Sequence, residues 1–243
     1  MKRLIYPAVV VLFLLLPSFF TVAAVYKTPI QISLWSPAQI FSPDTYVNGL
    51  RIALGYGDNY QVKGLDISLM ANSCAQMTGI EFALLLSECS ELMCGIQLAG
   101  IVADCGHLQG IQLSAFINGC HGEMSGIQLS SIKNDADSAG GLQICGLLNG
   151  CQDTMAGIQA SAIHNSAGST KGIQISAIKN FCRDEMNGIQ IAGLMNQCNG
   201  HAKGIQIGAL NVCESLTGIQ VGLVNIVTSD KWIPFIPILN ARF

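Results

Sequence analysis

The segment Gly-Ile-Gln-Ile-Ser-Ala-Ile-Lys-Asn at residues 172–180 contains every element of a short unit that recurs along most of the chain. With its glycine as position 0, the unit has apolar residues at 1, 3 and 6, glutamine at 2, small residues at 4 and 5, and asparagine at 8. Apolar and polar residues alternate over the first half of the unit, which is typical of a β-strand, and Ile, Leu and Val favour strands. We therefore expect short strands joined by tight turns, and no helix.

The unit recurs from about Asn48 almost to the end of the chain, with a period of about 15 residues. Its glycines are Gly49, Gly64, Gly79, Gly95, Gly110, Gly126, Gly141, Gly157, Gly172, Gly188, Gly204 and Gly218. A repeat this short cannot bury a core alone and must be completed by its neighbours. This pattern predicts an all-β solenoid, of the β-roll or β-helix type, with about twelve repeats.

The expected interior of each coil is its apolar set. Positions 1, 3 and 6, with the frequent Cys at 10 and the Met or Leu two residues before the glycine, would point inward and encircle the coil. Asparagine at position 8 tolerates left-handed backbone, so its recurrence indicates a turn. Stacked coils would align the asparagines and the glutamines into two ladders of identical amides. The outside would then be a flat polar wall.

A longer period of about 31 residues, which equals two units, is superimposed on the repeat. It separates the cysteines Cys89, Cys120, Cys151, Cys182 and Cys213. The duplicated element is therefore a double unit, and three architectures would produce it. Two solenoid coils could be duplicated together, one coil could span the whole double unit, or strands could run alternately up and down.

The third architecture is the alternative fold, an antiparallel β-barrel of the outer-membrane type. A signal peptide, an even number of short strands and the terminal Phe243 favour it. The interrupted alternation at positions 4 to 6 argues against it, and so do Pro234 and Pro237 in the last apolar stretch. The sequence therefore favours the solenoid over the barrel.

The ends of the chain differ from the repeats. A basic start, an apolar run and the small residues Thr21–Ala24 predict a signal peptide over 1–24, or a membrane anchor over 4–25 if this segment stays uncut. We expect an N-terminal cap over 25–47, the repeat solenoid over 48–225 and a C-terminal cap over 226–243. In the C-terminal cap, Trp232 and the two prolines would cover the last coil.

Composition and motifs argue against catalysis and nucleic-acid binding. Charged residues make up only 11% of the chain and the net charge is −3, too weak a field to attract nucleic acid or an anionic membrane surface. The four histidines occupy different repeat positions, and no phosphate-binding loop occurs. The sequence therefore predicts no enzyme, no catalytic residue, no cofactor and no metal site.

Cysteine is the one chemically reactive residue type with a repeated position. Ten cysteines occur, and eight share one place in the unit: Cys74, Cys89, Cys105, Cys120, Cys151, Cys182, Cys198 and Cys213. Neighbouring coils about 4.8 Å apart would bring successive members within the Cα range that a disulfide allows. Disulfides and a ladder of buried thiols are both consistent with this arrangement. No CxxC pair occurs, so zinc is not expected.

The chain resembles a family of bacterial surface-repeat proteins with Gly-[Leu/Ile]-Gln-[Ile/Val]-Gly-x-x-Asn repeats. The resemblance rests on the units at 204–211 and 218–225, on the ending at 233–243 and on the entry segment at 33–37, and it covers about 30–243. It implies an exported protein without catalytic residues. This chain departs from the pattern by its cysteines and by a residue inserted in most units, which places asparagine at 8 instead of 7. By shape the units also resemble the β-roll heads of trimeric bacterial adhesins.

These observations predict an exported, non-catalytic structural or adhesive scaffold at the cell surface, in the outer membrane or in the periplasm. Its partners are expected to be other envelope or surface proteins, with membrane contact through 4–25 if the signal stays uncut. The alternative function is an outer-membrane pore.

Overall fold

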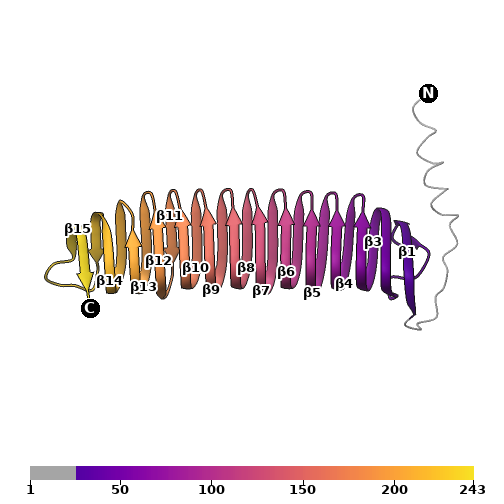
Figure 1. The fold of residues 1–243 in the computed structure, drawn as a ribbon, viewed down its shortest axis with the longest axis horizontal. Helices are drawn as coiled ribbons and strands as arrows, with labels where there is room; N and C mark the ends of the chain where they lie inside the picture. The colour runs from indigo at the N-terminus through magenta and orange to yellow at the C-terminus, as the bar shows by residue number, and fades with distance from the viewer. Residues whose placement is uncertain (1–25) are drawn as a thin grey trace, which may run out of the picture.

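The protein is a straight β-solenoid of about 13 turns (Figure 1). The computed structural model describes residues 26–243. The predicted signal peptide over 1–24 and the whole 4–25 anchor segment lie outside the described residues. Within 26–243 the chain is strand, turn and bend without any helix, so none of it is a helix that could cross a membrane.

Fifteen strands form one continuous sheet that wraps around the solenoid. They are β1 (Lys27–Trp35), β2 (Ala38–Gln39), β3 (Tyr46–Ser68), β4 (Ala71–Ala83), β5 (Leu86–Ala99), β6 (Val102–Ser114), β7 (Ile117–Ser130), β8 (Lys133–Cys145), β9 (Leu148–Ser161), β10 (His164–Ser176), β11 (Lys179–Cys182), β12 (Met186–Ala192), β13 (Met195–Ile207), β14 (Leu210–Val227) and β15 (Phe235–Arg242).

Adjacent repeats are parallel and in register. Gly95 lies beside Gly110, and Gly110 lies beside Gly126, so each single unit is one complete coil. The predicted solenoid is confirmed, and the antiparallel barrel alternative is wrong. The longer period of the cysteines therefore reflects two coils duplicated together. Bulges between positions 10 and 13 absorb the length difference between units, for example between Cys105 and Leu108 opposite Cys120 and Met124.

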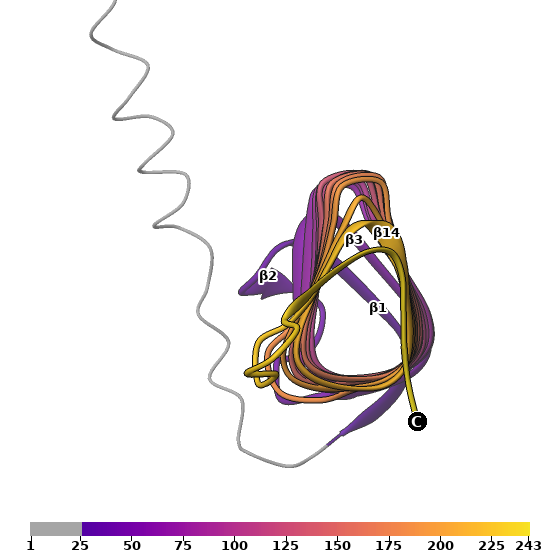
Figure 2. The same ribbon diagram turned by 90° about the vertical axis from the view of Figure 1, so that its left-hand side faces the viewer.

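The repeat glycine forms a corner that no other residue could form. All twelve repeat glycines have φ between 129° and 147°, a region that L side chains rarely adopt. A Cβ at Gly157 would also collide with the carbonyl oxygen of Gly141 in the preceding coil. Seen along the axis, the coils superimpose into one narrow closed outline (Figure 2).

The interior is not the apolar set that the sequence predicted. Positions −2 and 10 point inward as expected, as Met155 and Cys151 show, but positions 1, 3 and 6 point outward. Their places inside are taken by the glutamine at 2, the small residue at 4 and the asparagine at 8. Every repeat glutamine from Gln97 to Gln220 is fully buried, while Ile158 and Ile175 are 40% and 42% exposed. The predicted phase of the strand was therefore wrong by one residue.

Two amide ladders with opposite polarity run through the interior, from Gln97 and from Asn118 to the C-terminal end. Each glutamine from Gln112 to Gln220 donates Nε2–H to Oε1 of the glutamine one coil earlier, at 2.7–2.9 Å. Each asparagine from Asn118 to Asn211 donates Nδ2–H to Oδ1 of the asparagine one coil later, at 2.8–3.0 Å. The predicted ladders are confirmed, but they lie inside the coil.

Hydrogen bonding explains why polar side chains can fill this core. A buried amide is costly only when its donors and acceptors lack partners. Asn165, for example, donates to Asn180 and to the carbonyl oxygens of Gln159 and Ile175. Because the coils are in register, each amide finds an identical partner at about the strand spacing. The narrow interior is thus satisfied by amides, and the aliphatic residues are displaced to the outside.

The two ends of the solenoid are built differently. At the N-terminal end, β1 pairs in parallel with β3 and adds a coil before the first repeat glycine. At the C-terminal end, β15 pairs antiparallel with β14, and Asn240 donates to Gln220 to end the glutamine ladder. Trp232, which was expected to cover the last coil, is instead 93% exposed. Closure therefore comes from a returning strand rather than from an aromatic side chain.

Candidate functional site

The most distinctive surface is an extended layer of aliphatic side chains on the strand segments that follow the repeat glycines. We call it the aliphatic face and define it by the outward residues at positions 1 and 3 of the coils. Its members are Leu50, Ile52, Leu65, Ile67, Ile80, Phe82, Ile96, Leu98, Ile111, Leu113, Ile127, Leu129, Leu142, Ile144, Ile158, Ala160, Ile173, Ile175, Ile189, Ile191, Ile205, Ile207, Ile219 and Val221. All remain partly or fully exposed, although parallel pairing places each beside its equivalents in the adjacent coils.

The apolar surface continues over the adjoining corner. Position 6 carries a large apolar residue in most coils, and Phe116, Ile178 and Leu194 are 44%, 43% and 58% exposed. A single exposed leucine needs no explanation, but a contiguous apolar area of this extent on a soluble protein marks an interaction surface.

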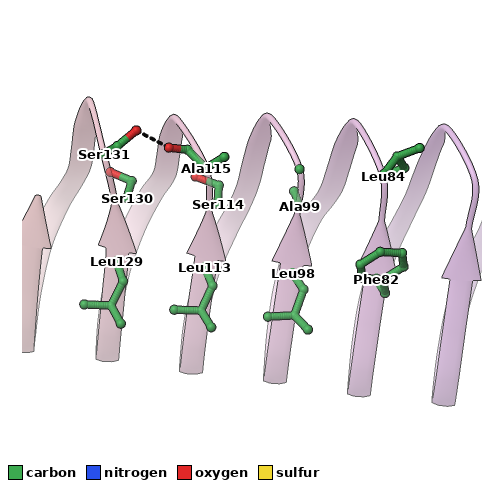
Figure 3. A pocket seen from close by; sticks show the side chains of 11 residues that line it. Phe82, Leu84, Leu98, Ala99, Leu113, Ser114, Ala115, Leu129, Ser130 and Ser131 are labelled. Carbon is green, nitrogen blue, oxygen red and sulfur yellow. Dashed lines mark hydrogen bonds between the residues drawn. The ribbon is translucent and has the colours of Figure 1, made fainter. Parts of the chain in front are cut away.

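The face is nearly flat, and a shallow hollow of about 490 Å³ lies along its edge. Figure 3 shows Phe82, Leu98, Leu113 and Leu129 in a row on neighbouring strands, with Leu84 above Phe82 and alanines or serines above the other three. The polar side-chain groups that line the hollow are serine hydroxyls, and Ser131 donates to the carbonyl oxygen of Ala115. The hollow therefore offers apolar contact rather than acid–base chemistry.

Charged residues are segregated away from the aliphatic face. Within the repeats, every exposed carboxylate lies between positions 9 and 13, as do Glu88, Asp104 and Asp153. The lysines of the repeats lie at the two borders of the apolar surface instead. Lys63, Lys171 and Lys203 directly precede a repeat glycine, and Lys133 and Lys179 occupy position 7.

The two lysines at position 7 interact with residues on the polar side of the coil. Lys133 pairs with Asp135 at 3.3 Å, and Lys179 lies 5.3 Å from the ring centre of Phe181. The three lysines before the glycines are exposed and form no ion pair within the described residues.

The eight repeated cysteines form an inner ladder. Cys74, Cys89, Cys105 and Cys120 are direct register partners in consecutive coils, and Cys182, Cys198 and Cys213 form a second run. All eight are buried, and all ten cysteines of the chain are free thiols. The remaining two differ in place, because Cys145 points inward at position 4 and Cys94 lies partly exposed before Gly95.

The environment of the ladder disfavours thiolate in most members. Burial raises the pKa of Cys151 to about 11 and that of Cys213 to about 12. Cys89, Cys120 and Cys182 differ, because a hydrogen bond from the neighbouring thiol lowers the pKa of each, to about 7 for Cys182. Cys182 also lies within donor distance of the Glu185 carbonyl oxygen, at 3.0 Å. Since thiolate reactivity requires access as well as charge, these thiols pack as small apolar side chains.

The other titratable groups are spread over the surface without forming a cluster. His121 contacts Asp104 at 3.0 Å. Several coils further along the rod, His201 shares a 2.8 Å hydrogen bond with Ser215. Burial lowers the pKa of His164, which lies on a third coil. Among residues 26–243, no group of three or more His, Cys, Asp or Glu side chains could hold a metal ion.

Sequence reasoning placed the cysteine ladder correctly inside but missed the aliphatic face. A signal for the face was present. Position 2 holds glutamine in nine successive coils, whereas position 3 varies among Leu, Ile, Phe, Ala and Val. An interior amide ladder tolerates no such variation, because each member must bond to an identical neighbour.

Comparison with known proteins adds no relative. No family model matches the chain, no curated protein resembles it, and no solved structure matches its fold.

Proposed function

We propose that this chain is an exported, non-catalytic scaffold of the bacterial envelope or cell surface, which adheres to another surface through its aliphatic face. The observation that carries the proposal is the extent of that face. It holds no charged residue from Leu50 to Val221, and it lies on a rod whose coils are joined by backbone hydrogen bonds throughout and by amide hydrogen bonds from Gln97 onward.

Other observations support a scaffold. A solenoid makes an extended, regular surface and has no need of a concave pocket. The signal-like start of the chain and the resemblance to bacterial surface-repeat proteins support export. The scattered histidines and carboxylates offer no arrangement of nucleophile, base and orienting group.

Export and adhesion are tested separately. The full-length gene is expressed in its bacterial host, and the mass and N-terminal residue of the protein are measured in cytoplasmic, periplasmic and membrane fractions. We expect a mature chain that begins at Val25 in the envelope fractions. A full-length chain confined to the cytoplasm would contradict export.

Adhesion is tested with the paired substitution Ile144→Glu and Ile175→Glu, which places two carboxylates on the face two coils apart. We expect this variant to be folded and exported but no longer retained on the surface to which the natural protein adheres. Retention equal to that of the natural protein would show that the face is not the adhesive surface.

A further inference from the structure

We propose that the aliphatic face binds the surface of a lipid bilayer that contains anionic phospholipid. This inference rests on the proposed function, because it names the surface to which the scaffold adheres. It depends on three features of the described residues: the area of the face, its flatness and the placement of charge around it.

The area of the face suits binding to a large partner. Twelve coils at about 4.8 Å and a strand of five residues give on the order of 900 Å². Individual soluble proteins rarely leave contiguous apolar patches larger than a few hundred Å² in water. An amphipathic surface of this kind lies in the membrane interface with its apolar side chains among the outer acyl segments.

Flatness distinguishes this face from an ordinary twisted sheet. The front strands in Figure 1 run side by side along the whole rod, and Figure 2 shows that the coils superimpose along the axis. The in-register pairing of Gly157 with Gly172 and of Ile158 with Ile173 places equivalent side chains in straight rows. A plane that extends for about 55 Å can touch a bilayer along its whole length, whereas a twisted sheet would diverge from it.

Charge decides between a bilayer and a second copy of this chain. The border before the repeat glycines carries Lys63, Lys171 and Lys203, and the opposite border carries Lys133 and Lys179. The carboxylates exposed on the repeats lie at positions 9 to 13, beyond both borders. Lys133 is paired with Asp135, but the other four lysines form no ion pair within the described residues. Two copies packed face to face would bring these lysines against a surface whose positions 1 and 3 hold no acid. Anionic headgroups supply that complement, and each lysine near such a surface strengthens binding by about fivefold.

Membrane contact was expected only through residues 4–25, and the net charge of −3 argued against an anionic membrane surface. The proposed contact depends instead on the local placement of lysines around the aliphatic face, and it uses a different segment. The proposed contact uses folded coils, so it survives removal of the N-terminal segment. The polar side of the rod, with its carboxylates, would then face away from the lipid.

The test is vesicle flotation of the protein as isolated from cells. One set of vesicles is phosphatidylcholine alone, and the other contains roughly one part phosphatidylglycerol to three parts phosphatidylcholine. We expect binding to the mixed vesicles at least about tenfold stronger than to phosphatidylcholine alone, and weaker binding as salt rises. Absence of binding to either vesicle would overturn the proposal.

Matched variants connect binding to the face. Ile144→Glu with Ile175→Glu should reduce binding at least about tenfold, because it buries carboxylates in the lipid interface. Ser166→Glu with Gln197→Glu adds the same charge two coils apart at position 9 and should keep most of the binding. Replacing Lys63, Lys171 and Lys203 by glutamine should remove most of the preference for phosphatidylglycerol. All variants share the same N-terminal segment, so differences between them report on the folded face. Equal binding by the face variant and the position 9 variant would overturn the proposal.

Sedimentation of the same samples separates this proposal from the broader function. A dimer that the Ile144 and Ile175 substitutions dissociate, without vesicle binding, would overturn the lipid assignment and leave an adhesive scaffold. A cytoplasmic protein that still binds the vesicles would instead contradict export and support the lipid contact.

Discussion

Glu81 occupies the position that glutamine holds in the nine coils that follow it. It belongs to an ionic start of the ladder, in which buried Arg51 forms a salt bridge with Asp66 one coil later. Asn72 also donates to Asp66, at 3.0 Å. Both carboxyl oxygens of Glu81 are buried, and neither has a hydrogen-bond partner. Burial, with the charge of Asp66, raises the pKa of Glu81 well above its usual range. Glu81 therefore occupies the ladder position beside Gln97 without bonding to it, because Gln97 donates to Ser87 and to the Asp104 carbonyl oxygen instead.

The first prediction is that Glu81→Gln stabilises the protein at neutral pH. The new amide could donate to Asp66 and accept from Gln97, as the ladder does elsewhere, and we expect a gain of about 1–3 kcal/mol in unfolding free energy. The raised pKa gives the sign of the pH dependence. In the natural protein, the contribution of Glu81 to stability is fully present below about pH 4.5, which is the ordinary pKa of a glutamate. This contribution is lost as the pH rises towards the pKa of Glu81 in the folded state. Urea unfolding at pH 7 and pH 4 measures the difference, which should shrink at pH 4. A loss of stability at pH 7 would show that a carboxylate is required there.

Register is the property of single residues that the sequence could not reveal by hydrophobicity. Gln159 and Ile158 are adjacent in the chain, and their side chains point to opposite faces of the strand. The strand period of two allows either side chain to be the inward one. The expectation that apolar residues face inward chose the wrong one. The number of repeats, their length, the ladders and the inward cysteines were all predictable, because they follow from spacing alone. The additional coil formed by β1 has no repeat glycine and was not predicted. The aliphatic face could not be predicted from hydrophobicity, because it depends on hydrogen bonds between coils that no single unit contains. Only the constant glutamine at position 2 indicated it.

The second prediction tests that register with two substitutions at adjacent residues. Gln159→Met keeps the volume but leaves Gln143 Oε1 without its donor and removes the acceptor of Gln174. We expect a loss of about 2–5 kcal/mol. Ile158→Gln should change stability by less than about 1 kcal/mol, because its side chain is 40% exposed. Thermal unfolding of the two variants measures the two losses of stability. A larger loss for Ile158→Gln would show that Ile158, and not Gln159, points inward.

At the scale of whole elements, the two amide ladders and the cysteine ladder form the connections between coils. The glutamine ladder donates towards the N-terminal end and the asparagine ladder towards the C-terminal end. Their dipoles therefore oppose each other, and the long stack accumulates little net dipole. The asparagine ladder lacks two members, since Ser87 and Ala103 occupy position 8 in consecutive coils. Asn118 Oδ1 is left without a partner beside this gap. We expect this N-terminal part of the interior to open more easily than the uninterrupted coils.

The third prediction concerns the thiols. Cys94 is the one cysteine that is not buried, so it should react first with an aromatic disulfide reagent. The other nine should react on the order of a hundredfold more slowly, through opening of the coils. Absorbance measured with and without denaturant, in the absence of reductant, counts both classes. All ten thiols should appear after unfolding. A smaller total would show that some neighbouring cysteines are joined as disulfides in the isolated protein. The variant Cys94→Ser should lose the fast phase alone.

Across the whole molecule, the solenoid behaves as a stack in which every coil contacts only its neighbours. Removal of whole coils should therefore be tolerated wherever the register of the ladders is restored, and this is the fourth prediction. Deletion of 126–156, one double unit, joins Ser125 to Gly157 and brings Gln112 beside Gln159 and Asn118 beside Asn165. The shortened protein should fold and be about 10 Å shorter, as small-angle X-ray scattering would measure. Deletion of 126–145 removes a shorter stretch but brings Gln112 beside a position other than glutamine, so it should fail to fold. The decisive variable is thus register and not length, because the interior is held by identical groups meeting one another. If both deletions folded equally well, the ladders would not be what aligns the coils, and the outward direction of the aliphatic face would lose its cause.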